Sequence, residues 1–492
     1  MIHIRLISAV SIVRIHIFSY LCTMQQEKVK ERTASPNTTN SMMSHSDTIC
    51  ALATATGGAL GIIRISGPQA FGAVSAITAI HCAECEGNTL HYTCVKNGTE
   101  TVDECMVSVF KAPHSYTGED SVEICCHGSR YILNKVLELL IQNGCRMAGP
   151  GEFTQRAYLN GKMDLSQAEA VADLIASSNQ ATHHLAMSQL RGHFSSELAQ
   201  LRAQLLKLTS LLELELDFSD HEDLEFADRT ELDKLAKNIN KHISKLIHSF
   251  ETGQALKQGI PVAIIGKTNV GKSTLLNRLL KDDRAIVSDI HGTTRDTIED
   301  TIDIKGVTFR FIDTAGIRQT SDEVEKIGIG RTYSAMEKAR IILWIVDEKP
   351  TNEEINEIIH QTGNKKVIVV RNKSDLNESQ SFTIADFPII SISAKLGTNI
   401  DALETVIYEA AGIPTLADSD IIVTNARHYD ALTRAQESLN RVISSLQAQV
   451  PGDLVAEDLR QVLSELAEIT GEGQITPNEI LGNIFKNFCV GK

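Results

Sequence analysis

The segment Gly266-Lys267-Thr268-Asn269-Val270-Gly271-Lys272-Ser273 has the spacing of a phosphate-binding loop, GxxxxGKS. It stands between an apolar run, PVAII, and a helical run, STLLNRLL, and such a loop needs this order of strand, loop and helix. Its two glycines let the backbone wrap with its N–H groups pointing inward. Lys272 can then reach the β and γ phosphates of a nucleotide, and the Ser273 hydroxyl can coordinate Mg²⁺. The predicted phosphate contacts are Asn269, Val270, Gly271, Lys272, Ser273 and Thr274.

Three further motifs follow strand-like runs in the order that a guanine-nucleotide site requires. The motif DTAG follows TFRFI, where an acid can hold the metal ion through water and a glycine can sense the γ-phosphate. The motif NKSD follows KVIVV, and its Asp375 can accept the two donors on the guanine N1 and N2 edge, which adenine lacks. The motif SAK follows PIISI. The predicted contacts in these motifs are Asp313, Thr314, Ala315, Gly316, Asn372, Lys373, Asp375, Ser393, Ala394 and Lys395.

The group that directs hydrolysis of the γ-phosphate differs from that of Ras-like enzymes. Ile317 follows DTAG, where those enzymes have a water-orienting glutamine, so another group must position the water. The stretch 288–296 is the expected first switch, in which Thr294 could ligate Mg²⁺. The amide oxygen of Asn269 could hold a monovalent cation that acts as an arginine finger does. The spacing fits equally well a side chain that only stabilises the loop.

Composition excludes several classes of protein. The chain has 492 residues, enough for about three domains, of which 42% are hydrophobic and 22% charged, so neither wholesale disorder nor a polytopic membrane protein fits. The formal net charge of −15 excludes a general phosphate-binding sheath, so any nucleic-acid contact must be local or shared with a partner. Ten cysteines without the density of a small disulfide scaffold favour a reducing compartment.

The order of patterns predicts a multidomain α/β plus α fold in which a Ras-like P-loop domain is inserted into a helical domain. Short β-branched runs alternate with turns up to residue 160, and apolar residues then recur at spacings of three and four, at Leu190, Phe194, Leu198, Leu201, Leu205, Leu208 and Leu212. A second helical stripe contains Leu459, Val462, Leu463, Leu466 and Ile469. We expect an extension at 1–46, an N-terminal α/β domain at 47–160, a helical domain at 161–256 and 416–492, and the P-loop domain at 257–415.

Three other segments carry weaker signals. Residues 1–22 are apolar but contain Arg5 and Arg14, and their longest uncharged stretch is shorter than the roughly 20 residues that a membrane helix needs. The segment could also serve as an organellar presequence, and we expect a partly disordered extension without stable membrane association. Cys82 and Cys85 form a CxxC pair with no second pair at zinc-ribbon spacing, which favours ordinary thiols. The acidic stretch 213–225 favours a solvated helix end over a metal site.

The chain resembles the MnmE (TrmE) family of tRNA-modification GTPases over about residues 47 to 492. The segments that carry the resemblance are ALGIIRISG, SYTGED, PGEFTQRAYLNGKMDLSQAEAVADLI, GKTNVGKSTLLNRLL, DIHGTTRD, DTAGIRQTSDEVEKIGI, TNARH and LGNIFKNFCVGK. The first supplies part of an N-terminal domain that resembles folate-binding domains, and the last is the C-terminal tail.

The resemblance implies how the nucleotide site works. The family hydrolyses GTP with the assistance of potassium, and the matching ligands are Asn269, Ser288, Ile290 and Thr293. Ser288 departs from the threonine expected there, which is harmless if the backbone carbonyl is the ligand. Glu325 matches the family's water-orienting acid, although from the residues alone Asp322 and Glu323 are equal candidates. The family is a homodimer whose P-loop domains meet across their nucleotides, so that hydrolysis is coupled to opening and closing.

The resemblance also implies a folate site and a modification reaction. The contacts to 5-formyl- or methylene-tetrahydrofolate map to Arg64, Glu123, Lys162 and Lys492; without the resemblance, Arg64 and Glu123 are taken as surface charges. Cys489 resembles a proposed functional thiol, and a buried structural cysteine is equally compatible. The implied reaction adds a carboxymethylaminomethyl group to C5 of the wobble uridine of tRNA, in the cytoplasm.

The partner implied by the resemblance is a flavoprotein, MnmG (GidA), which contains FAD and forms a heterotetramer with the family's dimer. Two rival functions remain at this point. One is an Era-like ribosome-assembly GTPase, against which the C-terminal segment shows no basic GXXG motif and no aromatic platform for RNA. The other is a GTPase anchored to a membrane by residues 1–22.

Overall fold

The computed structural model describes residues 47–217, 229–282, 300–312, 334–363, 365–376, 382–384, 387–413, 421–471, 484–485, 488 and 491, without the side chains of 213–217 and 281–282. The expected extension 1–46 and residues 218–225 of the acidic stretch lie outside this description, whereas residues 213–217 form the end of a helix. The chain divides into two compact units, one made of Met1–Gly149 with Gly491 and the other of Pro150–Val490 with Lys492. The domain bounds expected from the sequence stay predictions.

In its described residues from 47 to 149, the first unit is a six-stranded sheet with two helices. Its elements are β1 (Thr48–Leu52), β2 (Leu60–Ser66), α2 (Ala70–Ile77), β3 (Thr89–Asn97), β4 (Glu100–Phe110), β5 (Ser121–His127), α3 (Arg130–Gln142) and β6 (Cys145–Met147), and the strand order is β3-β4-β5-β2-β1-β6. Only the β1–β6 pair is parallel. Residues of β2, β4 and β5 alternate between buried and more exposed, and the buried set packs against α2 and α3. This sheet positions Arg64 and Glu123 on neighbouring strands.

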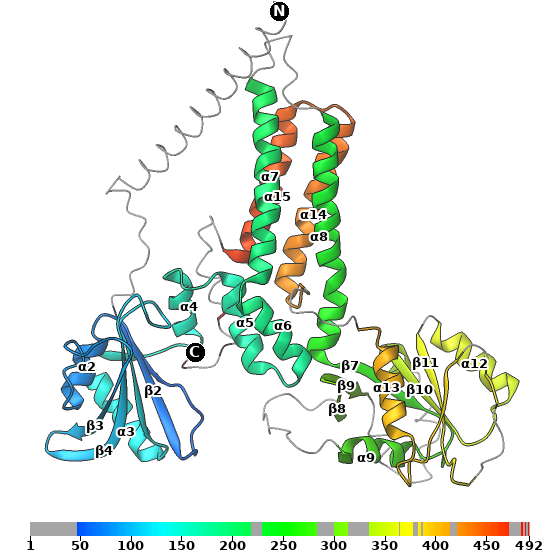
Figure 1. Cartoon of the computed structure of the whole chain (residues 1–492), viewed down its shortest axis with the longest axis horizontal. Coiled ribbons are helices and arrows are strands. Elements are labelled where there is room, and N and C mark those ends of the chain that lie inside the picture. The colour runs from blue at the N-terminus through cyan, green and yellow to red at the C-terminus, as the bar shows by residue number, and fades with distance from the viewer. Residues whose placement is uncertain are drawn as a thin grey trace, which may run out of the picture. The chain divides into compact units, whose positions relative to one another are not determined.

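The helical part of the second unit begins with three short helices and contains a bundle of four longer ones. The short helices are α4 (Glu152–Leu159), α5 (Leu165–Ala176) and α6 (Gln180–Leu190), and the bundle consists of α7 (His193–Asp217), α8 (Arg229–Gln258), α14 (Ala426–Gln447) and α15 (Gly452–Thr470), which run side by side in Figure 1. One buried cluster joins these four helices. Both helical stripes predicted from the sequence lie in this core, with one correction. Leu190 is the last residue of α6, because Gly192, at φ +83°, separates α6 from α7.

The P-loop domain is a second six-stranded sheet within the same unit. Its elements are β7 (Ile260–Ile265), α9 (Lys272–Asp282), β8 (Asp300–Ile304), β9 (Val307–Phe311), β10 (Ile341–Val346), α12 (Asn352–Thr362), β11 (Lys366–Arg371), β12 (Ile389–Ser391) and α13 (Ile400–Ala410). The strand order is β12-β11-β10-β7-β9-β8, and only β8 and β9 pair antiparallel. The strands are nearly continuous apolar runs because both faces of the sheet are covered.

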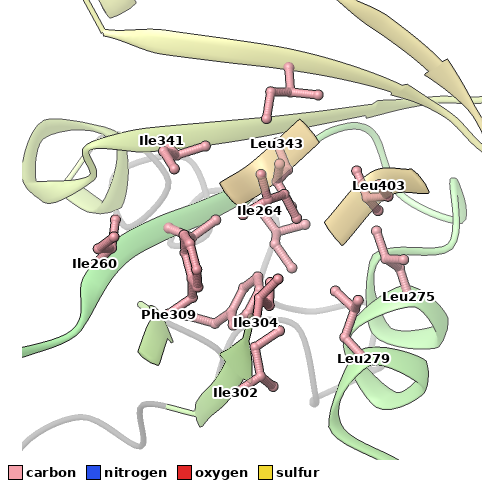
Figure 2. Close-up of a cluster of buried hydrophobic side chains, with 14 of the residues drawn as sticks. Ile260, Ile264, Leu275, Leu279, Ile302, Ile304, Phe309, Ile341, Leu343 and Leu403 are labelled. Carbon is pink, nitrogen blue, oxygen red and sulfur yellow. The ribbon is translucent and has the colours of Figure 1, made fainter. Parts of the chain in front are cut away.

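Alternate residues of each central strand belong to two separate cores. Ile264 and Leu343 point to one face, where Figure 2 shows them converging with Leu275 of α9 and Leu403 of α13. Residues such as Trp344 belong to the other core, against which Ile355 and Ile358 of α12 pack. The period-2 geometry of a strand therefore divides one apolar run between two helical layers.

Among the residues that the structure describes, the P-loop domain is connected to the helical part of the unit at two joints. Helix α8 leads into β7 with Gly259 as the single intervening residue. At the second joint the N-terminus of α6 meets the β8–β9 turn: the Asn179 amide donates to the Thr308 hydroxyl at 2.7 Å, and the Ala181 N–H donates to the Gly306 carbonyl at 2.9 Å.

Among the described residues, no helix combines the length and the apolar character needed to cross a membrane.

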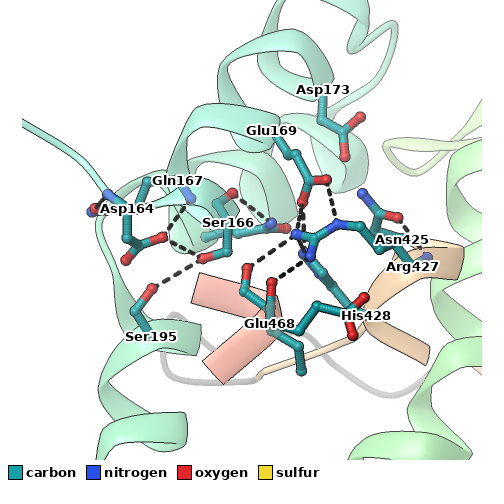
Figure 3. Close-up of polar contacts among 12 residues, drawn as sticks. Asp164, Ser166, Gln167, Glu169, Asp173, Ser195, Asn425, Arg427, His428 and Glu468 are labelled. Carbon is teal, nitrogen blue, oxygen red and sulfur yellow. Dashed lines mark hydrogen bonds and ion pairs between the residues drawn. The ribbon is translucent and has the colours of Figure 1, made fainter. Parts of the chain in front are cut away.

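A buried ionic cluster connects α5 with both C-terminal helices. The carboxylate of Glu169 accepts hydrogen bonds from the Arg427 guanidinium at 2.9 Å and lies 2.6 Å from Nε2 of His428 (Figure 3). The same guanidinium donates to the backbone carbonyls of Glu468 at 2.7 Å and Ile469 at 3.0 Å, near the end of α15. The cluster thus joins helices that precede and follow the P-loop domain in the chain.

Candidate functional site

The sheet of the P-loop domain brings three of the four predicted nucleotide motifs to one edge. Strands β7, β10, β11 and β12 run parallel, so their carboxyl ends lie at the same edge. The phosphate-binding loop follows β7, the NKSD segment follows β11, and the SAK segment follows β12. The carboxyl edge of a parallel sheet is where ligands bind in open α/β folds. The motifs are therefore placed to form one site.

The phosphate-binding loop takes a conformation that depends on its glycines. Gly266 has φ +144°, and a Cβ there would lie 2.3 Å from the carbonyl oxygen of Ile345. Gly271 has φ +98°, and a Cβ there would lie 2.2 Å from Nδ2 of Asn372. Both contacts are impossible for a side-chain carbon. The loop is therefore wrapped tightly between β10 and the NKSD segment, as cradling of phosphates requires.

Lys272 is the first residue of α9, at the end of the loop. Its ammonium group donates to the Gly266 carbonyl at 2.7 Å and to the Lys267 carbonyl at 2.6 Å, and burial lowers the pKa of Lys272. Phosphate oxygens are stronger acceptors than these carbonyls because they carry charge. Ser273 is the next residue of the helix, so its hydroxyl is at the helix N-terminus, where anions and their metal ions bind.

Asn372 connects the phosphate-binding loop to the base-binding segments. Its side-chain amide donates to the Val270 carbonyl at 2.8 Å, and its side-chain oxygen accepts from the Ala394 N–H at 3.0 Å. The residue is 4% exposed, so both hydrogen bonds are shielded from water. One side chain thus fixes the distance between the loop that faces phosphates and the segment that faces a base.

The base-binding end presents an ionised acid. The hydrogen bond from the Ser393 side chain lowers the pKa of Asp375, and the charge of Lys395 acts in the same direction. An ionised carboxylate accepts hydrogen bonds at both oxygens, which matches the donor pair on the guanine edge. Ser393 is itself buried, and its hydroxyl accepts from the Leu396 N–H at 3.2 Å.

Two residues near this end were not found by sequence reasoning. Asp347, directly after β10, pairs with Lys373 at 2.9 Å, and its position at the end of a buried strand was a usable signal. Arg278 of α9 donates to the Lys395 carbonyl at 3.3 Å, and a Cβ at Gly397 would lie 2.7 Å from its Nη2. No motif marks Arg278, because its contact depends on how α9 packs beside the SAK segment.

The remaining predicted nucleotide residues lie outside the described part of the chain. They are the first-switch residues Ser288, Ile290, Thr293 and Thr294, the DTAG residues Asp313, Thr314, Ala315 and Gly316, and the candidate water-orienting acid Glu325. Asn269 is described: it is exposed in the loop and has φ +63°, a left-handed conformation that asparagine tolerates better than most residues.

A second candidate site lies in the first unit. Arg64 of β2 stands directly opposite Glu123 of β5 in the antiparallel register. The guanidinium contacts Glu123 Oε1 at 2.8 Å through both Nε and Nη2, and its Nη1 is 3.4 Å from the Gly491 carbonyl. It also lies 5.2 Å from the ring centroid of Tyr116. The pair is partly exposed, at 17% for Arg64 and 26% for Glu123, so it remains accessible to a ligand.

The loop that carries Tyr116 is held against β2 by hydroxyl groups. Ser66 Oγ lies 2.6 Å from the Thr117 hydroxyl and donates to Glu119 at 2.8 Å. In the sequence, this loop carries part of the family resemblance, but Tyr116 was not predicted as a site residue. Its aromatic type between two hydroxyl residues was the available signal.

The other residues predicted for the folate site and the C-terminal tail are Lys162, Lys492 and Cys489. Lys162 belongs to the second unit, where it is exposed in the turn after α4 and its N–H donates to the Ala157 carbonyl at 2.9 Å. Lys492 and Cys489 lie outside the described residues. In the same tail, Phe485 and Phe488 pack with Leu165 of α5.

The CxxC pair has the surroundings of core thiols. Cys82 is fully buried in the core of the first unit, where burial raises the pKa of its thiol, and Cys85 is half-buried beside it. Within the described ranges, no three histidine, cysteine or acidic residues group as a metal site.

Comparison with known proteins covers nearly the whole chain. A family model described as the GTP-binding protein TrmE N-terminus matches residues 48–162, and one described as the MnmE helical domain matches residues 165–489. A solved structure, the G domain of the FeoB iron transporter of T. maritima, is 22% identical, covering 31% of this chain and 98% of that one, with a TM-score of 0.24.

Curated relatives match over their full length. The tRNA modification GTPase MnmE of Phocaeicola vulgatus is 54% identical, covering 92% of this chain and 100% of that protein. The protein with the same description from Bacteroides thetaiotaomicron is 55% identical, covering 91% and 99%, and that of Flavobacterium psychrophilum is 48% identical, covering 92% and 100%. With this identity and coverage, and with its phosphate-binding loop and base-binding segments at one sheet edge, the chain belongs to the MnmE (TrmE) family of tRNA modification GTPases.

Proposed function

We propose that this GTPase adds a carboxymethylaminomethyl group to C5 of the wobble uridine of certain tRNAs, in the cytoplasm and together with an FAD-containing MnmG (GidA) flavoprotein. Family membership favours this modification over the ribosome-assembly alternative. The observation that carries the folate part of the proposal is the Arg64–Glu123 pair beside Tyr116. Hydrolysis of GTP powers a conformational step and does not itself make the new bonds.

The chemistry of the Arg64 cluster fits a reduced folate. A guanidinium suits the anionic tail of a folate, a carboxylate accepts hydrogen bonds from donor nitrogens on a pterin edge, and an aromatic face stacks on a flat ring. Because Arg64 and Glu123 neutralise each other at 2.8 Å, both charges are held in place before a ligand arrives. Lys162 and Lys492 are the further proposed contacts. The folate supplies a one-carbon unit.

Magnesium and potassium are the proposed ions of the nucleotide site. Ser273 and Thr294 would hold Mg²⁺. For K⁺, Asn269 offers a side-chain oxygen from an exposed position in the phosphate-binding loop, and Ser288, Ile290 and Thr293 would complete the ligands. The left-handed backbone at Asn269 supports a role beyond filling space, since it costs conformational energy that a glycine would avoid. A cation there supplies positive charge next to the phosphates, and Glu325 would orient the water.

The proposed assembly is a homodimer that forms a heterotetramer with the flavoprotein. A net charge of −15 supports a division of labour in which the partner carries much of the tRNA contact. A negative net charge is still compatible with a local basic surface on this chain.

Reconstitution tests the proposal. The purified chain, the flavoprotein, a reduced folate, glycine, GTP and unmodified tRNA are combined, and the tRNA nucleosides are measured by mass spectrometry. We expect the modified uridine only in the complete mixture, and expect Arg64→Gln to reduce it while GTP hydrolysis stays intact. Unmodified wobble uridine in the complete mixture overturns the proposed reaction. Modification that proceeds equally without folate, or equally in the Arg64 variant, overturns the folate site.

A further inference from the structure

One face of α8 carries a row of basic side chains. Lys234, Lys237, Lys241, Lys245 and His248 follow one another at spacings of three, four, four and three residues, and all are exposed. Residues at such spacings lie above one another on one side of a helix. At 1.5 Å per residue the row extends over about 21 Å. We call these five residues the basic face of α8.

The basic face points away from the bundle. Ile239 and Ile243 are fully buried in the core, so they mark the inner side of α8. On one flank Asn240 donates to Asn440 of α14 at 2.9 Å, and on the other His242 lies 3.4 Å from Glu197 of α7. The basic face lies between these flanks on the outer side of α8, which Figure 1 shows beside α7 and α14.

Of the four lysines in the basic face, Lys237 alone forms an ion pair among the described residues of α8. Lys237 contacts Asp233 at 2.7 Å. In the part of the chain that the structure describes, no carboxylate pairs with Lys234, Lys241 or Lys245. The acidic residues of α8 are near its two ends, at Glu231, Asp233 and Glu251.

The arginines of the neighbouring helix α14 are paired, including Arg427 with Glu169. Arg434 of α14 contacts Glu465 at 2.7 Å and Glu468 at 2.6 Å, and Arg441 contacts Asp458 at 2.9 Å. On α8 the spacing instead repeats like charges four residues apart, at 237 and 241 and again at 241 and 245, an arrangement that disfavours a helix. Apart from the Lys237–Asp233 pair, the spacing of the row gives the helix no ion-pair support, and in a chain of net charge −15 the row forms a separate positive surface.

We propose that the basic face of α8 binds the phosphate backbone of the tRNA substrate. Lysine is a flexible point charge, suited to phosphates in any sequence, and a row of lysines can follow successive phosphates along one strand. This surface would add affinity without reading bases, which fits an enzyme of a family that modifies tRNA. The inference rests on the proposed function in that the bound RNA is the tRNA being modified.

The test removes three unpaired charges and compares a matched control. In one variant Lys234, Lys241 and Lys245 are all replaced by Gln. In the control Lys96, Lys338 and Lys366, which are exposed elsewhere, are replaced by Gln. Binding of the full chain to fluorescent, unmodified tRNA is measured by anisotropy without nucleotide, at salt concentrations from about 50 to 200 mM. Urea unfolding and GTP hydrolysis check that both variants fold.

We expect the α8 variant to bind tRNA at least about tenfold more weakly at the lowest salt, with the slope of log K against log salt reduced by about 2, since each phosphate contact contributes roughly 0.7 to 0.9. Arginine at the same three positions should restore binding. The tRNA affinity of the control should stay within about twofold of that of the wild-type chain, because its three lysines are not part of the basic face. Its charge change equals that of the α8 variant, so the two differ only in the position of the charges removed.

Four results would overturn the inference. One is unchanged tRNA binding by the α8 variant, and another is equal weakening in the control, which would reveal a net-charge effect only. The third is loss of binding to phosphatidylserine vesicles while tRNA binding persists, which would assign the face to a membrane surface. A wild-type chain that binds no tRNA at low salt also overturns it, whereas the reconstituted modification decides the proposed function separately.

Discussion

Replacement of Glu169 by Gln is the perturbation for which the structure gives the clearest magnitude. Glu169 is 7% exposed and contacts both Arg427 and His428. Its charge is therefore the counter-ion in the buried ionic cluster that connects α5, α14 and α15. Gln keeps the shape of the side chain and removes the charge. The guanidinium of Arg427 would then remain in the buried ionic cluster without its carboxylate.

The expected loss of stability follows from the pKa of Glu169. Burial alone would raise this pKa, but the hydrogen bond and charge of His428, together with those of Arg427, outweigh it and hold the pKa at about 2 instead of the ordinary 4.5. A difference of roughly 2.5 units corresponds to about 3 kcal/mol of folding free energy. Removing one partner of a buried ion pair typically costs about 3 to 5 kcal/mol, which agrees. We therefore expect Glu169→Gln to lower the free energy of unfolding at pH 7 by about 3 kcal/mol.

The pH dependence provides the internal check. The folded-state pKa is depressed, so the contribution of Glu169 is fully present above the unfolded pKa near 4.5 and is lost as pH falls toward 2. The difference between variant and wild type should therefore be largest at neutral pH and close to zero near pH 2. Urea unfolding followed by circular dichroism measures it, with Glu437→Gln, an exposed acid of α14, as the control. A difference below about 0.5 kcal/mol at pH 7, the level of an ordinary surface substitution, would refute the reasoning.

Three further predictions concern the nucleotide site. Asn372→Ala leaves the buried Val270 carbonyl and Ala394 N–H without their partner, each at a cost of about 1 to 3 kcal/mol, so urea unfolding should show the free energy of unfolding lowered by at least about 2 kcal/mol; a loss below about 0.5 kcal/mol would contradict the link. Glu325→Ala should leave GTP binding nearly unchanged while phosphate release falls steeply, and surviving turnover would remove the water-orienting assignment. Replacing potassium by sodium should slow hydrolysis in the same phosphate assay, and identical rates in the two salts would exclude the ion role of Asn269.

Local sequence patterns predicted the parts of the molecule that depend on neighbouring residues. The apolar runs of β7, β10 and β11 are strands because β-branched residues suit a sheet covered on both faces. The phosphate-binding loop was predictable because its glycine positions are dictated by backbone geometry. The same reasoning went wrong at Leu190, where a spacing of four residues spans the Gly192 turn and only resembles helix continuity.

Contacts between distant residues could not be predicted in this way. Arg64 and Glu123 are 59 residues apart, and the sequence alone favoured two surface charges until the strand register placed them opposite each other. Arg427 reaches Glu169 across 258 residues because helices that precede and follow the P-loop domain in the chain pack together. The role of Asn372 as a link to Val270 likewise depends on the packing of two loops at one sheet edge.

The central claim is that guanine nucleotide bound at this sheet edge powers tRNA modification, and a change of base preference tests it most directly. Asp375→Asn exchanges an acceptor for a donor, which matches xanthine, whose C2 carbonyl replaces the guanine amino group. In the reconstituted reaction, we predict that the variant loses modification with GTP and regains it with XTP, while the wild-type chain shows the reverse. Full modification by the variant with GTP, or by the wild-type chain with ATP, would contradict the account.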